Sequence, residues 1–305
     1  MSLAILCSGQ GPQHPHMFAL TGDAREAADI FAHAATLLGG RDPRKMVQSD
    51  ADSVLHENRV AQILCAAQTL AAAAILRDAL PGRLLIAGYS VGEAAAWGVA
   101  GFVNLTGTLD LVARRAEVMD AASAPGDGLL FIRGLTRDMV DGLCERYDAA
   151  VAIVNPGDAY VVGGIGASLD TLAEDAKRMG AVRVVRLAVN VASHTPRLAA
   201  ASVEFRKLLN QISIRRAPNM GVRLFSGIDG DAVFDVPTGM DKLAAQISHT
   251  LQWATCLESC VEAGASAFLE LGPAGHSVRW LPAHILISPP AAWKISGPCK
   301  VSVCG

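Results

Sequence analysis

The chain has 305 residues, of which 51% are apolar and 5% aromatic, and a formal net charge of −3. This length suits one large α/β domain or two ordinary ones, with a substantial buried core. The small negative charge gives no reason to expect a nucleic-acid partner or an anionic membrane surface. Apolar runs are interrupted by charges or glycines before about 18 residues, so no membrane span is expected.

The seven cysteines form neither a Cys-x-x-Cys pair nor a Cys/His cluster with zinc spacing, so no metal site is predicted. Cys7 and Cys65 lie in apolar runs and are interpreted as core residues. The first seven residues are too short and too uncharged for a secretory signal. These features favour reduced thiols and a cytoplasmic protein.

Leu3–Cys7 is an apolar run that predicts a buried strand, and the glycine-rich loop Gly9-Gln10-Gly11 follows it. The loop lacks the dinucleotide-binding fingerprint and the lysine of a P-loop, which argues against nucleotide binding. Gln10 is instead a candidate for donating a hydrogen bond to an oxyanion, through its backbone or its side-chain amide. The alternative is an ordinary polar loop residue.

Two helices are predicted next, over residues 23–38, with Asp23 as a candidate N-cap, and over residues 58–80. In the second, apolar residues recur at helical spacing, at Ile63, Ala67, Leu70 and Ala74. Gln62 and Gln68 interrupt its apolar character. Most such glutamines face solvent, but Gln62 is a candidate neighbour of a site.

The stretch from residue 84 to residue 100 predicts a nucleophile elbow. The apolar run Leu84–Gly88 reads as a strand, Gly88-Tyr89-Ser90-Val91-Gly92 has the Gly-x-Ser-x-Gly pattern, and an alanine-rich helical pattern follows from Glu93. Glycines flank the serine because the turn is too tight for other side chains, and the serine is pushed out at the edge of the sheet. Ser90 is therefore the candidate nucleophile. The alternative is a turn whose serine only caps the helix.

A third helix is predicted over residues 108–119, with the adjacent pair Arg114-Arg115. Such a pair usually belongs to a solvated face. An arginine is also the residue that binds a substrate carboxylate through a bidentate pair. Both readings stand on the residues alone.

From about residue 122 the pattern changes to short strands and helices in the order β-α-β-β-α-β, which is the ferredoxin-like signature. Residues 123–190 are therefore predicted to form a small subdomain inserted into a larger one. The predicted elements are strands at 128–132, 151–155, 159–162 and 183–188, and helices at 136–147 and 168–179.

The chain then returns to the main body at residues 190–196, which contain His194. As one of eight histidines it is a candidate general base, because a triad histidine can lie far from the serine in sequence. The alternative is a structural histidine. The remaining predicted elements are helices at 198–214, 241–248 and 251–263 and strands at 221–226 and 267–271.

The tail after about residue 277 has closely spaced prolines, two cysteines and no helical period. A large α/β domain is expected to close with a helix there. We hypothesise that this tail is translated out of frame. The alternative is an ordinary irregular terminus.

Taken together, the motifs resemble the malonyl-CoA:acyl-carrier-protein transacylase family over about residues 3–277. The resemblance rests on Gly9-Gln10-Gly11, Gly88-Tyr89-Ser90-Val91-Gly92-Glu93, Arg115, Met119, Asn155, Ser193-His194, Gln246 and Glu270-Leu271-Gly272-Pro273. It implies a hydrolase-like parallel-sheet α/β core formed by residues 1–122 and 191–305, with the ferredoxin-like subdomain inserted between them.

The resemblance also implies roles for individual residues. Ser90 would be the nucleophile and His194 its general base, oriented by the backbone carbonyl of Gln246. The backbone N–H of Val91 and the region of Gln10 would form the oxyanion hole. Arg115 would pair with the carboxylate of a malonyl group. Other candidate pocket residues are Gln62, Tyr89, Met119, Asn155 and Ser193.

Two residues depart from the family pattern. Tyr89 stands where many relatives have histidine. Ser193 stands where malonyl-selecting polyketide modules tend to carry phenylalanine, and the Ala-Ser-His pattern goes with methylmalonyl in those modules. The resemblance therefore leaves the choice between malonyl and methylmalonyl open.

The chain most resembles one branch of this family, the epsilon subunits of malonate decarboxylase, in Cys-x-Gly-Gln-Gly-x-Gln-His-Pro and Gly-Tyr-Ser-Val-Gly-Glu. This implies transfer of malonyl from malonyl-CoA to the phosphopantetheine-type arm of the decarboxylase's own acyl carrier subunit, by a ping-pong acyl-serine route. No tightly bound cofactor is implied. The alternatives are a transacylase of fatty-acid or polyketide synthesis, a serine esterase or thioesterase, and a non-catalytic relative.

Overall fold

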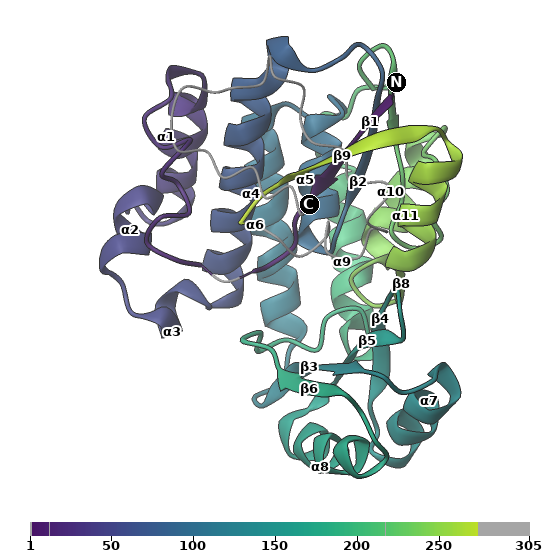
Figure 1. Cartoon of the computed structure of the whole chain (residues 1–305). Coiled ribbons are helices and arrows are strands. Elements are labelled where there is room, and N and C mark those ends of the chain that lie inside the picture. Colours follow the sequence, from purple (N-terminus) through teal and green to yellow (C-terminus); the bar gives the residue numbers. More distant parts are fainter. Residues whose placement is uncertain (1, 12, 217, 274–305) are drawn as a thin grey trace.

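The computed structural model describes residues 2–11, 13–216 and 218–273, and Figure 1 shows their arrangement. The strands are β1 Ser2–Cys7, β2 Leu84–Gly88, β3 Asp127–Arg133, β4 Ala150–Asn155, β5 Ala159–Ile165, β6 Arg183–Arg186, β7 Val222–Leu224, β8 Leu251–Gln252 and β9 Ala265–Leu271. The α-helices are α1 Ala28–Leu37, α2 Pro43–Ser49, α3 Asp52–Leu55, α4 Asn58–Leu76, α5 Val91–Val99, α6 Leu105–Ala122, α7 Arg137–Arg146, α8 Gly166–Arg178, α9 Ala199–Leu209, α10 Val236–Ala245 and α11 Trp253–Glu262.

The core sheet has the strand order β7-β2-β1-β9, and each of its neighbouring pairs is parallel. Successive residues of β1 point to opposite faces, as strand geometry requires. Leu3 and Ile5 pack into one apolar cluster, whereas Ala4 and Leu6 pack into another. Both faces of the sheet are therefore covered, which explains why its strands are apolar throughout.

Helices lie on both sides of this sheet, as Figure 1 shows. One cluster joins the sheet to α4, α5 and α6, and α1 packs outside them. The other face is covered by α11, which contributes Trp253 and Cys256. The structure thus has the expected α/β architecture with a parallel-sheet core.

Helix α4 is the most buried long helix of the core. Within the described part of the chain, one helical stretch, Asn58–Ala79, is long and apolar enough to cross a membrane, and 67% of its most apolar window is buried inside the protein. Packing against α1, α5 and α6 accounts for this composition, since a surrounded helix needs apolar side chains on several faces. The expectation that its glutamines face solvent is wrong, because Gln62 and Gln68 are both buried.

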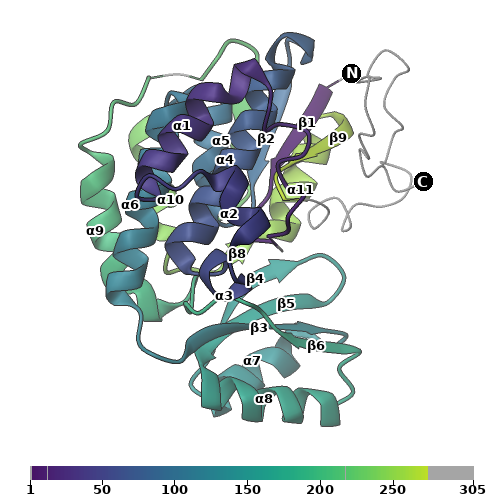
Figure 2. The ribbon, with the colours of Figure 1, turned by 90° about the vertical axis from the view of Figure 1, so that its left-hand side faces the viewer.

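A second sheet has the order β6-β3-β5-β4-β8, and Figure 2 shows it beneath the core with α7 and α8 on its outer face. Its first four strands are antiparallel neighbours in the ferredoxin-like order, with α7 and α8 as the two crossover helices. The fifth strand, β8, pairs in parallel with β4 and comes from the main body of the chain. This strand physically joins the inserted subdomain to the core.

Several predicted boundaries were wrong for identifiable reasons. Asp23 caps no helix, since a 3₁₀ turn at Arg25–Ala27 leads into α1. Helix α10 begins before the predicted residue 241, because Asp235 accepts from the backbone N–H of Thr238 and caps it. The predicted helix 251–263 divides into β8 and α11, because Leu251 pairs with Ile153 across the subdomains.

Two further differences concern helices. The predicted helix 198–214 is a 3₁₀ turn, Pro196–Leu198, followed by α9, which ends at Leu209. No element was predicted between residues 39 and 57, where α2 and α3 lie. Asp42 caps α2 by accepting from the N–H of Arg44, with Pro43 in the first turn, a pattern that marks a helix start.

The hypothesis about the tail lies outside the described residues, which end at residue 273.

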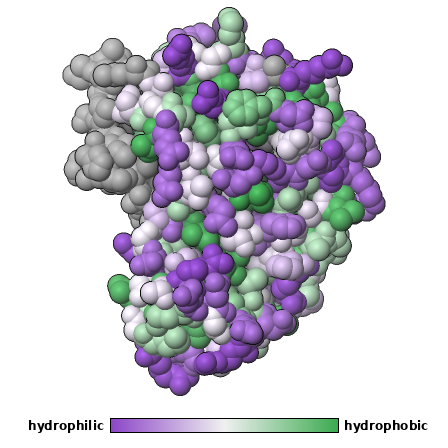
Figure 3. Space-filling model, turned by 90° about the vertical axis from the view of Figure 1, so that its right-hand side faces the viewer, coloured by the Kyte–Doolittle hydropathy of each residue, from purple (hydrophilic) through white to green (hydrophobic). Residues whose placement is uncertain are grey.

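On the side that lies to the right in Figure 1, polar residues cover most of the described surface, with apolar residues scattered between them (Figure 3). Such scattering is normal for a folded protein surface.

Candidate active site

Ser90 lies at the turn between β2 and α5, as the glycine pattern predicts. Its φ angle of 55° is rare for a residue with a side chain. A Cβ at Gly88 would lie 2.2 Å from the backbone nitrogen of Glu93, and one at Gly92 would lie 2.1 Å from the carbonyl oxygen of Cys7. Only glycine fits at either position. The turn therefore holds the serine hydroxyl out from the end of β2.

His194 reaches the serine from a sequence distance of 104 residues. Its Nε2 lies 2.8 Å from Oγ of Ser90, and its Nδ1 lies 2.5 Å from the backbone carbonyl of Gln246. The carbonyl can only accept, so Nδ1 carries the proton and Nε2 is free to accept from the serine. The histidine backbone is also in the left-handed region, with φ 62°. The structure thus places a neutral imidazole against the serine hydroxyl.

Burial keeps this imidazole neutral. Desolvation, and then the charge of Arg115, lower the pKa of His194 to about 3, although the hydrogen bond that Nδ1–H donates to the carbonyl of Gln246 opposes the shift. An imidazole without a proton on Nε2 is the form that can take one from a hydroxyl.

Arg115 is fully buried on α6. Its Nη1 donates to Oε1 of Gln62 at 2.6 Å and its Nη2 donates to Oε1 of Gln246 at 2.8 Å, while its Nε has no partner among the described residues. Desolvation lowers the pKa of Arg115 to about 10, and Glu93 opposes the shift. The guanidinium therefore stays charged at neutral pH, and its Nε–H and the second N–H of each Nη are not used in these two bonds.

The side chain of Gln246 connects these groups. Its Nε2 donates to the backbone carbonyl of Ser90 at 2.7 Å and to Oε2 of Glu93 at 3.0 Å, while its Oε1 accepts from Arg115. A flipped amide would place its NH₂ against the guanidinium and its oxygen against two acceptors, so the neighbours fix its orientation. One residue thus contacts the serine, the histidine and the arginine.

Glu93, for which no role was predicted, is 1% exposed in the first turn of α5. Its carboxylate accepts from Gln246, from Oγ of Ser226 at 3.2 Å and from the N–H of Gly227 at 3.1 Å. Desolvation raises the pKa of Glu93 to about 7 against these bonds and the charge of Arg115. A carboxylate directly after the Gly-x-Ser-x-Gly pattern, in an otherwise apolar helix, was the available signal.

The two candidates for the oxyanion hole lie beside the serine. Val91 is the first residue of α5, and its N–H has no acceptor among the described residues. Gly9 packs so close to the elbow that a Cβ there would lie 3.4 Å from Cβ of Ser90. The side chain of Gln10 instead turns towards Asn58, at 3.5 Å. Only the backbone of Gln10 is thus free for the expected role.

The other candidate pocket residues lie around this network. Met119 is fully buried, with its sulfur 3.5 Å from Nε2 of Gln62. Ser193 is buried beside His194. Tyr89 packs edge-on against Trp253, with ring centroids 5.3 Å apart, and its hydroxyl lies beside Asn155.

Asn155 has an unusual environment at the end of β4. Its side chain is 3% exposed, and among the described residues neither its Oδ1 nor its Nδ2 makes a hydrogen bond of regular geometry, although the Tyr89 hydroxyl lies beside it. Buried amides are normally paired. This side chain can both donate and accept, so it is equipped to meet a group that does the same.

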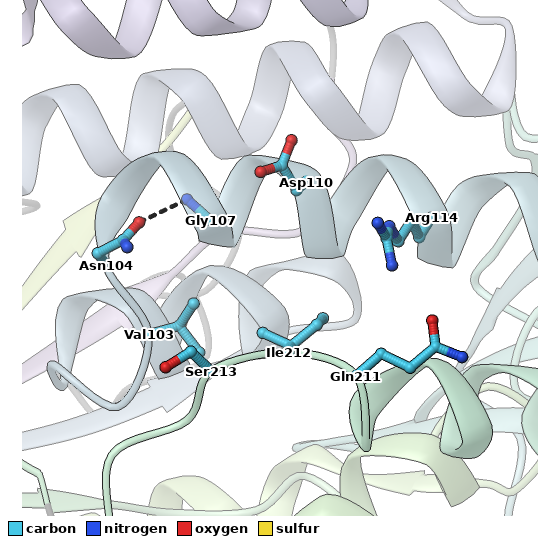
Figure 4. A pocket seen from close by; sticks show the side chains of 8 residues that line it. All are labelled: Val103, Asn104, Gly107, Asp110, Arg114, Gln211, Ile212 and Ser213. Atoms are coloured by element: carbon cyan, nitrogen blue, oxygen red, sulfur yellow. Dashed lines mark hydrogen bonds between the residues drawn. The ribbon is translucent and has the colours of Figure 1, made fainter.

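Arg114 and Arg115 have opposite surroundings. Arg114 lines a surface hollow of about 220 Å³ between α6 and residues 211–213, together with Asp110 and Gln211 (Figure 4). The solvated-face reading therefore holds for Arg114 and fails for the buried Arg115. Among the described residues, no group of three or more His, Cys, Asp or Glu side chains is placed to hold a metal ion.

The fold and the site define the class of protein: an α/β enzyme with a serine at a strand-to-helix turn and a histidine bonded to it. The model of the acyl transferase domain matches residues 5–278, and the chain belongs to this family. A malonyl CoA-acyl carrier protein transacylase from Mycobacterium bovis is 30% identical over 94% of this chain and 97% of its own length. One from Staphylococcus aureus is 26% identical over 88% of each chain.

Solved structures agree with this assignment. The malonyl CoA-acyl carrier protein transacylase from Coxiella burnetii superposes with a TM-score of 0.84 at 25% identity, covering 92% of this chain and 89% of that chain. The acyl-carrier-protein S-malonyltransferase from Burkholderia pseudomallei gives a TM-score of 0.82 at 25% identity, covering 93% and 98%. Part of the polyketide synthase GfsB from Streptomyces halstedii is 30% identical over 90% of this chain, which spans 5% of that protein.

Proposed function

We propose that this enzyme transfers a malonyl group from malonyl-CoA to the prosthetic-group thiol of an acyl carrier protein. The observation that carries the proposal is the placement of Arg115. One amide, that of Gln246, separates this buried guanidinium from Ser90, and its Nε–H has no partner. A buried cation with a free donor beside a nucleophile selects an acyl group that carries its own carboxylate.

The acyl group moves in two steps. His194 takes the proton of Ser90 while the serine oxygen attacks the thioester carbonyl, and the proton then passes to the leaving CoA thiol. The carrier thiol next gives its proton to His194 and attacks the acyl-serine, and the serine recovers the proton. The backbone N–H groups of Val91 and Gln10 stabilise the oxyanion in both steps.

Arg115 acts on binding and on the base. Its Nε–H and an Nη–H bind the malonyl carboxylate as a pair. The bound anion offsets the positive charge that lowers the pKa of His194, so the imidazole becomes a stronger base when malonyl is in place. An acetyl group has no carboxylate and leaves this charge uncompensated.

The same geometry argues against a serine esterase. A neutral backbone carbonyl, and not a carboxylate, orients His194. Arg115 also has no role in hydrolysing an uncharged ester. We assign five further residues to the walls of the acyl and thioester pocket. Gln62 contacts Arg115 and Met119 contacts Gln62, whereas Tyr89 and Ser193 directly precede Ser90 and His194, and Asn155 lies beside Tyr89.

Two carriers are candidates. The carrier subunit of malonate decarboxylase is favoured by the loop Cys-x-Gly-Gln-Gly-x-Gln-His-Pro and by Tyr89, which packs against that loop at Gly9. A carrier protein of fatty-acid or polyketide synthesis is favoured by the names of the relatives, malonyl CoA-acyl carrier protein transacylases and a polyketide synthase.

The test is intact mass measured after brief incubation with malonyl-CoA, acetyl-CoA or methylmalonyl-CoA, with Ser90→Ala as the control. We expect a malonyl adduct that is absent in Ser90→Ala and absent with acetyl-CoA. The loaded enzyme is then offered each type of purified holo carrier, and the one that receives the malonyl group faster identifies the carrier. Absence of any adduct from a folded protein would reject acyl transfer through Ser90.

A further inference from the structure

The malonyl carboxylate meets a buried site that already contains a carboxylate. Arg115 is fully buried, and the side chain of Glu93 is 1% exposed on the other side of the Gln246 amide. The charges of Arg115 and Glu93 offset each other in the free protein. A second anion bound to Arg115 would leave the buried site with a net negative charge, which is strongly unfavourable away from water.

We propose that Glu93 is a resident counter-ion of Arg115 that gives up its charge when the acyl carboxylate binds, by taking one proton from solvent. This inference rests on the proposed function, because it assumes that Arg115 binds the malonyl carboxylate. It makes Glu93 a specificity residue that never touches the substrate. A dicarboxylic acyl group drives the proton uptake and an acetyl group does not.

The contacts of Glu93 allow the proton to be added without breaking the network. Oε2 accepts from Gln246 and from the N–H of Gly227, both of which only donate, so this oxygen stays an acceptor. Oε1 faces the hydroxyl of Ser226, which can turn and accept instead of donating. The proton therefore belongs on Oε1, and the orientation of Gln246 is retained.

Glu93 is also poised for the change. Its burial in the first turn of α5 raises its pKa to about 7, so it is largely ionised at pH 8 and needs only a small further shift to be protonated. The other charged or titratable groups that act in this cluster are Arg115 on α6, His194 across Gln246, and Cys256 on α11. The pKa of His194 is too low, and that of Cys256 too high, for either to titrate in this range.

The test is titration calorimetry of malonyl-CoA and acetyl-CoA into Ser90→Ala protein between pH 6 and 8.5, in buffers of different ionisation enthalpy. Both ligands carry the same CoA. The titration with acetyl-CoA therefore measures the protons exchanged by the CoA phosphates, and this number is subtracted from the malonyl-CoA result. For malonyl-CoA we expect an additional uptake that rises to about one proton by pH 8. Above pH 7 its Kd should increase with pH, by a factor that approaches about tenfold per pH unit. Acetyl-CoA should show neither.

The matched variant is Glu93→Gln, whose amide oxygen accepts from Gln246 and Gly227 while its NH₂ donates to Ser226. It mimics the protonated carboxyl, so the additional proton uptake should vanish. At pH 8 malonyl-CoA should bind this variant about tenfold more tightly than it binds the protein that retains Glu93. Equal proton uptake with both ligands, or uptake that persists in Glu93→Gln, overturns the inference. Equal affinity for both ligands, unchanged by Arg115→Ala, instead rejects the proposed function. If Glu93→Gln does not fold, the difference in proton uptake between malonyl-CoA and acetyl-CoA still tests the inference.

Discussion

The backbone carbonyl of Gln246 lies 2.5 Å from Nδ1 of His194, in the position that a carboxylate occupies in a hydrolase triad. A carbonyl fixes the tautomer as a carboxylate does, but it stabilises the imidazolium less. Thiols are more acidic than alcohols or amines and leave readily. Exchange between two thiols therefore needs less help from the base than amide hydrolysis does.

Replacement of His194 by alanine should lower the rate of Ser90 acylation by about 10²- to 10⁴-fold, because the serine loses the group that takes its proton. Rapid-quench mass spectrometry with malonyl-CoA measures this rate. The control is His249→Ala, since His249 is exposed on the surface and should leave the rate unchanged. A His194→Ala variant that acylates within threefold of the parent would show that another group acts as the base.

Arg115→Ala should lower kcat/KM for malonyl-CoA by about 10²-fold or more, because the substrate carboxylate loses its charged partner. The activity with acetyl-CoA should not fall in parallel. Its neighbour offers a matched control: Arg114 lies on the same helix but lines the surface hollow, so Arg114→Ala should change neither activity. Equal losses with both thioesters would mean that Arg115 serves only the structure.

The raised pKa of Glu93 predicts that the free energy of unfolding depends on pH. Its folded-state pKa of about 7 is above the ordinary value of 4.5 for this side chain, so the folded state holds more protons than the unfolded state between these values. The stability that Glu93 contributes is thus present below pH 4.5 and is lost as the pH rises through 7. Glu93→Gln removes this loss, and its stability relative to the parent should increase by up to about 3 kcal/mol between pH 5 and pH 8. Urea denaturation at both pH values measures the difference, and a difference that is constant with pH would show that Glu93 is not protonated preferentially in the fold.

The local patterns carried most of the fold prediction. The elbow at Ser90 was predictable because its glycines, strand and helix lie within 17 residues, and steric exclusion at Gly88 and Gly92 leaves no other solution. The ferredoxin-like order of the inserted segment followed from the alternation of its elements. Strand β8 was not predictable, because two residues carry no period and its formation depends on the edge of β4.

The candidate site likewise contains residues that a local pattern reveals and residues that it does not. Ser90 was visible in the residues. For His194 and Arg115 the residues left two readings open, and only the resemblance favoured one of them, since long-range contacts leave no local pattern. The burial of Gln62 could not be read from its sequence position, because it depends on the guanidinium brought by a different helix. Glu93 was missed for the same reason: its three donors come from residues 226, 227 and 246.

The residue before the histidine should control the size of the acyl pocket. Ser193 is buried, and its replacement by phenylalanine fills space beside His194. Ser193→Phe is therefore expected to lower methylmalonyl transfer relative to malonyl transfer by about tenfold, the scale on which a pocket discriminates one methyl group. Competition between the two thioesters, read by adduct mass, gives the ratio. Ser193→Ala should leave the ratio within threefold, and a Phe variant with an unchanged ratio would remove Ser193 from the acyl pocket.

Two glycines in helices should respond to alanine with opposite signs. Gly92 in α5 has the carbonyl oxygen of Cys7 2.1 Å from the place of a Cβ, so Gly92→Ala must push α5 away from β1 and should destabilise the fold by roughly 3 kcal/mol or more. Gly142 in α7 has nothing within 4 Å, so Gly142→Ala should stabilise by about 0.5–1 kcal/mol through helix propensity. Urea denaturation of both variants tests the pair. A stable Gly92→Ala protein would mean that the elbow packs less closely on β1 than described, and the position assigned to the Ser90 hydroxyl would then be wrong as well.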